Sequence, residues 1–432
     1  MVGAGVFLST GFMAQSMTPS AILLAWVVGA VLALAGARAY AEVSRLVPEG
    51  GGEYRYLSNL WHPALGYVAG WASLLVGFSA PIALDALAAG AFARSVWPGL
   101  EPRLFAAAMV VLLTAVHAFG LHLSTRIQNA LVAVKVVLLV GFVAVGLGLG
   151  TLSFPTWQPP DLSGMTPAGF AGSLFYIAFA FSGWNAAIYA SDEFKDPRRD
   201  VPRAMLLGCF AVGALYLVVN YIFVANLTPA EGTAVFGYND FASLKSGNDS
   251  VTLGQVVMAR LLGPAAAQAM SLMMLVLFVS AMSAMTLVGP RVYAAMARDG
   301  FLPRWLAGAE GEAPRGAVVL QGLLALVVLF THELRTVLSN VGAILVLFAA
   351  LTVCGLFVQA RRAKTPEARP SPVSLVAAGV YVLSAALMLY FGFRDTPSLL
   401  GWVGAVSGVA LVAWALTRSS MQQKASAEKV AP

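Results

Sequence analysis

Repeated apolar runs about 20 residues long constrain the fold of this chain more than any other feature. A helix needs about 20 apolar residues to cross the hydrocarbon core of a bilayer. The sequence has eleven such runs and a shorter one at its start, at residues 1–16, 20–44, 64–97, 104–121, 125–149, 168–192, 202–227, 263–291, 316–332, 335–360, 373–393 and 396–417. It therefore predicts an all-α polytopic membrane protein.

The charged residues fit this class of protein. Only 11% of the 432 residues are charged, against about 25% in soluble domains. Nineteen of the 26 Lys and Arg residues fall in alternate loops on one side of the predicted spans, and six fall on the other side. Cytoplasmic loops are the basic ones, so we expect both termini in the cytoplasm and the chain in the plasma membrane, which in bacteria is the inner membrane. The asymmetry explains the net charge of +6 without a nucleic acid partner.

Two of the predicted helices are interrupted by small residues. Gly3-Ala4-Gly5 stands in the first run, and Ser182-Gly183 divides the run at 168–192. A spanning helix is interrupted only where protein or a watery cavity surrounds the freed backbone groups. Paired interruptions in two halves of a chain indicate the substrate site of an inverted-repeat transporter. Because so few residues precede Gly3, we expect the first helix to be truncated at its N-terminus.

The two interruptions differ in the charge that they attract. The half-helix after Gly5 presents free N–H groups and the positive end of its dipole, which suit a carboxylate. The half-helix that ends near Ala180 leaves free carbonyls, which suit a protonated amine. Together they predict a pocket for a zwitterion. The alternative is that both are packing contacts, since small residues are common where membrane helices touch.

Lys135 and Asp85 are ionisable residues inside predicted spans. Such residues face a cavity or a partner by default. Two roles for Lys135 stay open: it carries a proton during transport, or its amine permanently holds backbone carbonyls at the first interruption. Asp85 either pairs with a cation or lies near the outer vestibule.

Sequence patterns of other function classes are missing from the chain. The four His residues show no metal-ligand spacing, the two Cys residues form no CxxC motif, and there is no Walker loop. We therefore expect no enzyme activity, no cofactor and no metal site.

Two charged segments lie outside the spans. We interpret residues 192–203 as a solvated loop, with an intracellular latch between Glu193 and Arg199 as the alternative. The polar tail at 418–432 is expected to be cytoplasmic and disordered.

Four motifs resemble those of amino acid permeases of the amino acid/polyamine/organocation (APC) superfamily. They are GAGVF at 3–7, PEGGGEY at 48–54, FAFSGWN at 179–185 with the charged segment to residue 204, and RVYAAMARDGFLP at 291–303. The triplet Gly183-Trp184-Asn185 is closest to L-type and related bacterial permeases.

The resemblance implies a leucine-transporter-like fold that works by alternating access. Its five-plus-five inverted repeat would comprise a first repeat at 1–149 and a second at 168–360, followed by two additional spans at 373–417 and the tail.

The resemblance also implies roles for particular residues. The main chain of Gly3, Ala4 and Gly5 would hold the substrate carboxylate. Carbonyls of Phe179, Ala180 and Ser182 would hold the amine beside Gly183. The Phe179 ring would act as a gate, Asn185 as a polar contact, and Trp184 as a packing aromatic or a wall of the pocket. Lys135 matches a lysine that takes the place of a sodium ion, so no sodium site is expected.

The substrate follows less directly from these residues. The pocket motifs carry no acidic side chain, which favours a neutral amino acid. A cationic amino acid or a polyamine is the alternative, with Asp85 as the buried acid. Proton symport, exchange and facilitated diffusion stay open, as do the oligomeric state and an accessory subunit. A non-transporting amino acid sensor or subunit is the alternative from another function class.

Overall fold

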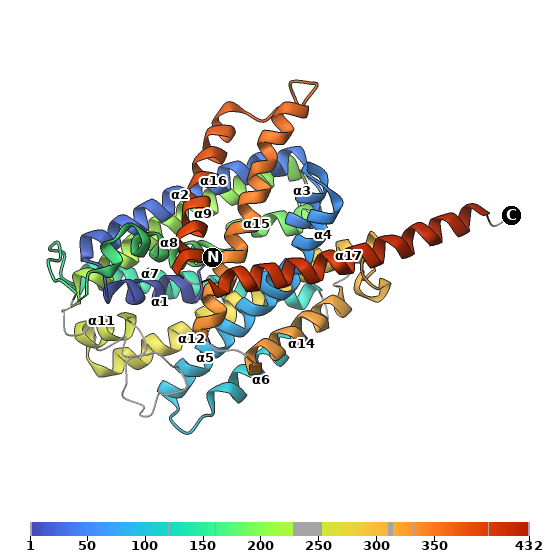
Figure 1. Cartoon of the computed structure of the whole chain (residues 1–432). Helices are drawn as coiled ribbons and strands as arrows, with labels where there is room; N and C mark the ends of the chain where they lie inside the picture. Colours follow the sequence, from blue (N-terminus) through green and yellow to red (C-terminus); the bar gives the residue numbers. More distant parts are fainter. Residues whose placement is uncertain are drawn as a thin grey trace.

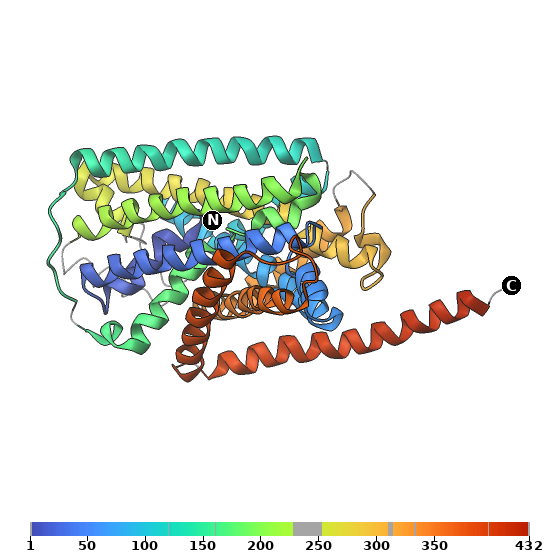
Figure 2. The ribbon, with the colours of Figure 1, turned by 90° about the horizontal axis from the view of Figure 1, so that it is seen from above.

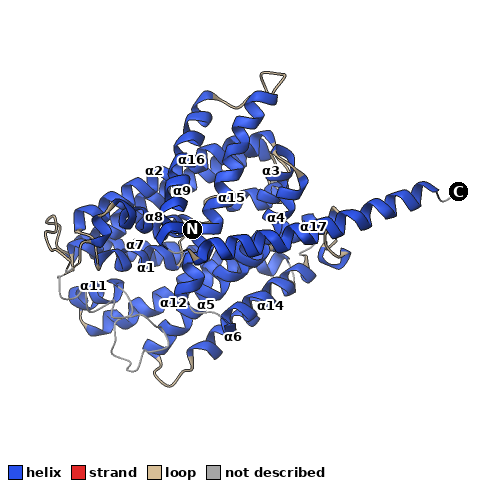
Figure 3. Cartoon of the chain, viewed as in Figure 1, coloured by secondary structure: helices blue, strands red, loops and turns tan. Residues whose placement is uncertain are grey.

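The chain is helical throughout the part that the structure covers. The computed structural model describes residues 2–119, 121–159, 161–227, 253–309, 314–331, 334–395 and 397–430. Every regular element within these ranges is helical, and none is a strand (Figure 3). The predicted all-α class is confirmed.

The first part of the chain forms seven α-helices and one π-helical segment. They are α1 (Ala4–Ala14), α2 (Pro19–Leu46), α3 (Glu53–Leu60), α4 (Pro63–Ala72), η1 (Ser73–Ser79), α5 (Ala80–Val96), α6 (Pro102–Ala118) and α7 (Leu121–Leu149).

The elements after residue 150 that the structure describes are also helical. They are η2 (Ser163–Met165), α8 (Pro167–Phe181), η3 (Ala186–Glu193), α9 (Pro197–Ala225), α11 (Leu253–Leu262), α12 (Pro264–Val288), α13 (Pro290–Arg298), η5 (Arg304–Leu306), α14 (Arg315–Thr331), α15 (Leu334–Arg362), α16 (Pro372–Asp395) and α17 (Ser398–Val430).

Eight helical segments within the described ranges are long and apolar enough to cross a membrane. They are Pro19–Leu46, Pro63–Val96, Ser124–Leu149, Pro167–Glu193, Pro197–Ala225, Pro264–Arg298, Val341–Arg362 and Pro372–Arg394. Shorter apolar helices accompany them at Gly5–Ala14, Pro102–Ala118, Leu253–Leu262, Arg315–Thr331 and Val403–Thr417. This is a multi-pass membrane protein. The division into two inverted repeats stays a prediction.

Two predicted boundaries are wrong. Helix α9 begins at Pro197 rather than at residue 202, because Pro197 occupies the first helical position and Asp200 lies in the first turn, two features that favour a helix start. Helix α17 continues to Val430 instead of giving way to a disordered tail after residue 417. Its last part is rich in Ala, Gln, Lys, Glu and Met, which are strong helix formers.

The helices that contain the interruptions lie inside the bundle. Helix α1 packs against α8, α2 against α9, and α5 against α12, so segments far apart in sequence are neighbours (Figure 1). Helices α7 and α17 lie on opposite edges (Figure 2). Residues Val134, Val137 and Val140 of α7 are exposed, as is suitable for a surface that faces lipid tails.

Helices α4 and α5 form one continuous span through η1. Residues 73–79 wind as a π-helix, and the Ser79 hydroxyl donates a hydrogen bond of 2.7 Å to the Leu74 carbonyl. We expected an uninterrupted α-helix over 64–97. Such π turns occur often at functional sites, and Phe78 of this segment lines the central cavity described below.

Candidate functional site

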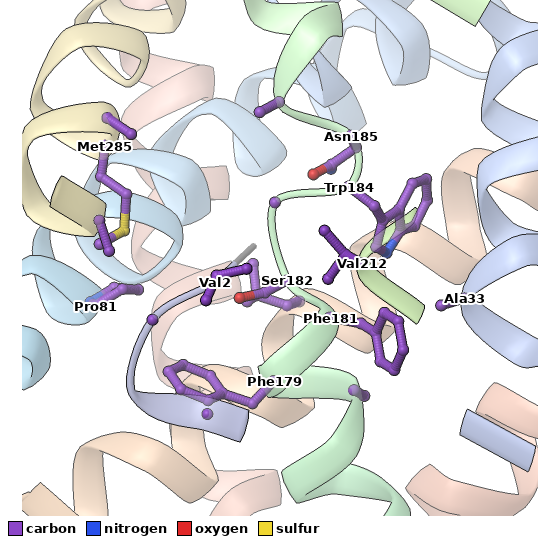
Figure 4. Close-up of a pocket in the computed structure, with 18 of the residues that line it drawn as sticks. Val2, Ala33, Pro81, Phe179, Phe181, Ser182, Trp184, Asn185, Val212 and Met285 are labelled. Carbon is purple, nitrogen blue, oxygen red and sulfur yellow. The ribbon is translucent and has the colours of Figure 1, made fainter. Parts of the chain in front are cut away.

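The predicted interruption at Ser182-Gly183 is present. Helix α8 ends at Phe181, and Ser182 has extended backbone angles (φ −53°, ψ 141°). Gly183 has a φ of +92°, a left-handed conformation that glycine adopts without the steric cost of a side chain. Figure 4 shows the chain passing from Phe181 through Ser182 to Asn185 without forming a helix.

The two interruptions meet. The N-terminus of α1 lies beside the end of α8, and Val2 lies close to Ser182 (Figure 4). A methyl group added to Gly5 would lie 2.8 Å from Ala180 Cβ and 2.9 Å from the Ala180 nitrogen. Only a residue without a side chain permits so close a contact between two backbones. The paired motifs therefore form one site.

A central cavity of about 550 Å³ opens at this meeting point. Most of the predicted site residues line it. They are Gly3, Gly5, Asp85, Lys135, Phe179, Ser182, Gly183, Trp184 and Asn185. Ala180 is absent from the lining and packs against Gly5. Ala4 begins α1, and its side chain lies outside the described part of the structure.

Lys135 contacts the first interruption directly. Its Nζ donates a hydrogen bond of 2.7 Å to the Val2 carbonyl, and the residue is only 9% exposed. Asp85 is 4% exposed, and its carboxylate lies 3.5 Å from where a Cβ on Gly3 would be. The charge of Asp85 also acts on Lys135. Both residues line the central cavity, and the roles considered for Asp85 stay predictions.

The carbonyls at the end of α8 are partly occupied. The Phe179 carbonyl accepts a hydrogen bond from the Ser182 N–H at 2.9 Å. The Ala180 carbonyl accepts one from the Tyr216 hydroxyl of α9 at 3.0 Å. Each carbonyl has a second lone pair, but the Ala180 carbonyl is directed to α9. Phe179 and Ser182 line the cavity and Ala180 does not; that these carbonyls hold an amine stays a prediction.

The two aromatic residues of the motif occupy different surroundings. The Phe179 ring lies next to the start of α1 (Figure 4). The Trp184 ring packs edge-on against Tyr40 of α2, with ring centroids 4.8 Å apart. Trp184 thus combines the two roles considered for it, because it packs against α2 and also lines the cavity.

Glu53 is a cavity residue that the sequence reasoning missed. This first residue of α3 is buried and lines the central cavity. Its Oε1 accepts hydrogen bonds from Asn185 Nδ2 at 2.8 Å and from the Tyr40 hydroxyl at 3.1 Å. Its Oε2 accepts one from the Tyr189 hydroxyl. Glu53 therefore connects α2 and α3 to the interrupted helix.

The surroundings of Glu53 hold no cation among the described residues. The titratable side chains that interact with its charge are all tyrosines, namely Tyr40, Tyr56, Tyr189 and Tyr381. Because α3 lies between two spans, Glu53 is outside the membrane-crossing segments. Burial raises the pKa of the Glu53 carboxyl above its usual value, and hydrogen bonds from Tyr189, Tyr40 and Asn185 oppose this rise.

Ion pairs join α13 and its C-cap residue to η3 and to α3. Arg291 donates a hydrogen bond of 2.8 Å from Nε to Glu193, and Arg55 pairs with Asp299 at 2.7 Å. Glu193 does form an ionic contact, but its partner is Arg291 of α13 and not Arg199. Helix α9 carries Arg199 within its first turn, whereas Glu193 ends η3. Among the described residues, no group of three or more His, Cys, Asp or Glu could hold a metal ion.

The fold and the site define a class of protein. The N-terminus of α1 and the interruption after α8 meet at one cavity, with main-chain donors from the first and main-chain acceptors from the second. This is the architecture of a secondary transporter.

Comparison with known proteins gives the family. The family model for amino acid permeases matches residues 1–416, and the chain belongs to this family, within the APC superfamily. It is 28% identical to the large neutral amino acids transporter small subunit 2 of Mus musculus, over 93% of this chain and 75% of that protein. It is 26% identical to the Asc-type amino acid transporter 1 of the same species, with the same coverage. It is 24% identical to the b(0,+)-type amino acid transporter 1 of Mus musculus, over 92% of this chain and 80% of that protein.

Proposed function

We propose that this chain is a secondary transporter that moves amino acids across the membrane by alternating access. The observation that carries the proposal is the contact between Gly5 and Ala180 at the wall of a buried cavity. This contact brings the N–H groups of one half-helix within reach of the carboxylate of a ligand whose amine binds the carbonyls of the other. The names of the relatives support an amino acid as the ligand.

The cavity favours a neutral amino acid. Leu, Val, Met and Ala dominate the lining apart from the residues already named, and apolar walls suit an apolar side chain. Glu53 adds a second buried acid to Asp85, but protein donors occupy both of its oxygens. A cationic amino acid or a polyamine is the second candidate, because the Asp85 carboxylate lies beside Gly3.

The same proposal covers the sodium dependence of transport, the orientation of the chain in the membrane and a test for an accessory chain. The Lys135 amine donates to a main-chain carbonyl at the first interruption, as a fixed cation in place of sodium would, so transport is expected to be independent of sodium. The basic loops place both termini in the cytoplasm, and the protein in the plasma membrane. One relative is named a small subunit, so purification with mass determination should test for an accessory chain.

Uptake by proteoliposomes tests the proposal. The purified chain is reconstituted, and uptake of a panel of labelled neutral, cationic and acidic amino acids is measured with and without an inward proton gradient. We expect uptake of neutral amino acids in potassium as in sodium buffer, and none in liposomes without protein. Binding of an amino acid at equilibrium without any flux would instead support the non-transporting sensor.

A further inference from the structure

The glycine-rich segment at 50–53 contacts η3 at three of its four residues. The Gly50 N–H donates a hydrogen bond of 2.9 Å to Asp192 Oδ1. Gly52 has a φ of +59°, and the Tyr189 ring occupies the space that a side chain on Gly52 would need. Glu53 then accepts a hydrogen bond from the Tyr189 hydroxyl. Tyr189 is therefore held by its ring and by its hydroxyl.

Tyr189 lies between two cavities. It lines the central cavity, and it also lines a second cavity of about 450 Å³. Its ring packs edge-on against Phe78 of η1, with centroids 5.1 Å apart and an angle of 77°. Phe78 lines only the central cavity of the two. These two rings form part of the wall between the cavities.

The second cavity has the chemistry of a passage for a zwitterion. Its lining contains Asp192, Glu193, Arg291 and Arg298, so charges of both signs are present. The contact between Arg291 and Glu193 involves a glutamate side chain that is 52% exposed, which places this end of the cavity near solvent.

We propose that Tyr189 is a gate between the two cavities, that Glu53 holds the gate closed, and that the amino acid leaves the central cavity through the second. The inference rests on the proposed transport function. Glu53 is a positioning residue, since it acts through the hydroxyl of Tyr189. The glycines next to it are needed because the Tyr189 ring packs directly against the backbone of residue 52.

Two cysteine reporters test the gate. Ala284 lines the central cavity and Ala307 lines the second cavity, and neither is among the residues expected to hold the carboxylate or the amine of the substrate. Each is changed to Cys in a chain that carries Cys209→Ser and Cys354→Ser. A membrane-impermeant thiol reagent is added to vesicles whose outer face is the side of the membrane near the second cavity. The rate of labelling is then measured for each reporter.

The gate predicts a selective change at the first reporter. Tyr189→Phe keeps the ring and removes the hydrogen bond to a carboxylate, so labelling at residue 284 should become faster by about tenfold. Labelling at residue 307 should stay the same. Glu53→Ala should act in the same direction, and Tyr189→Phe keeps the test valid if Glu53→Ala does not fold.

Matched controls carry the same substitutions elsewhere. Tyr221→Phe removes a hydroxyl that bonds to the Leu152 carbonyl, and Glu49→Ala removes an acid that is 61% exposed in the segment just before α3. Neither should change labelling at residue 284. If Tyr189→Phe leaves that rate unchanged while the wild type transports amino acids, the gate is wrong and the transport function stands. If labelling changes as expected without any uptake, the gate stands and the transport function fails.

Discussion

Replacing Gly5 with Ala should separate the two interruptions. The added methyl group would lie 2.8 Å from Ala180 Cβ, 2.9 Å from the Ala180 nitrogen and closer still to its Cα. Ordinary van der Waals contact begins at 3.4 Å. The start of α1 and the end of α8 must therefore move apart by more than half an ångström, and neither can do so by rotating a side chain, because the contact includes backbone atoms.

The size of the effect follows from the cost of overpacking. Inserting one methyl group into a close-packed site costs about 1–3 kcal/mol. If most of this cost falls on the bound state, the affinity for the amino acid should fall by about 5- to 150-fold. The same displacement moves the main-chain donors away from the acceptors across the cavity, so a zwitterion can no longer contact both sets at their best distances.

Equilibrium binding of a labelled amino acid in detergent measures this effect, and uptake by proteoliposomes follows it. Gly172→Ala is the matched control, since it lies on α8 and a methyl group there would meet no atom within 4 Å. The control should bind and transport as the wild type does. A folded Gly5→Ala protein with wild-type affinity and uptake would refute the reasoning that the two interruptions form one binding site.

Three further predictions concern charged groups. Lys135→Met removes the donor to the Val2 carbonyl, so uptake should fall about tenfold or more at every pH. The pH dependence of uptake should remain, and its loss would instead identify Lys135 as the proton carrier. Glu193→Gln breaks a half-exposed ion pair with Arg291 and should reduce the free energy of unfolding by less than about 1 kcal/mol, measured by denaturant unfolding in detergent. Burial raises the pKa of Glu53, so contact with water on gate opening should lower that pKa and release a proton. The ratio of labelling at residue 284 to labelling at residue 307 should then rise with pH, by up to about tenfold per pH unit, and should become independent of pH in Glu53→Gln. The ratio is used because each thiol becomes more reactive as it ionises. A ratio that still rises with pH in that variant would refute the role given to Glu53.

The interruptions could be predicted because they depend on local chemistry. Gly183 needs a positive φ, and Gly5 needs to lack a side chain. Lys135 stood out because an amine within an apolar span needs a partner, although the identity of that partner, the Val2 carbonyl, required the fold. The membrane class followed from the lengths of the apolar runs alone.

Other features depend on contacts between distant residues. Glu53 follows three glycines in a polar segment, and nothing nearby indicates that it is buried. Its partners Asn185 and Tyr189 lie 132 and 136 residues further along the chain. A glutamate directly after a glycine run at a helix start was the available signal. Likewise, the sequence reasoning considered Arg199 as the partner of Glu193, and Arg291 could be identified only once α13 was placed next to η3.

The π-helical turn at η1 fixes the orientation of the helix that follows it. Each residue advances an α-helix by about 100°, and a π turn takes up about one residue more than an α turn, so the same residues wound as an α-helix would rotate α5 by about that angle relative to α4. Pro81 and Asp85 would turn away from the central cavity. Ile82 and Ala83, which now pack in a cluster with residues of α6, α12 and α14, would turn toward it. The winding of residues 73–79 therefore decides which face of α5 lines the cavity, and it constrains the protein as strongly as the identity of these residues.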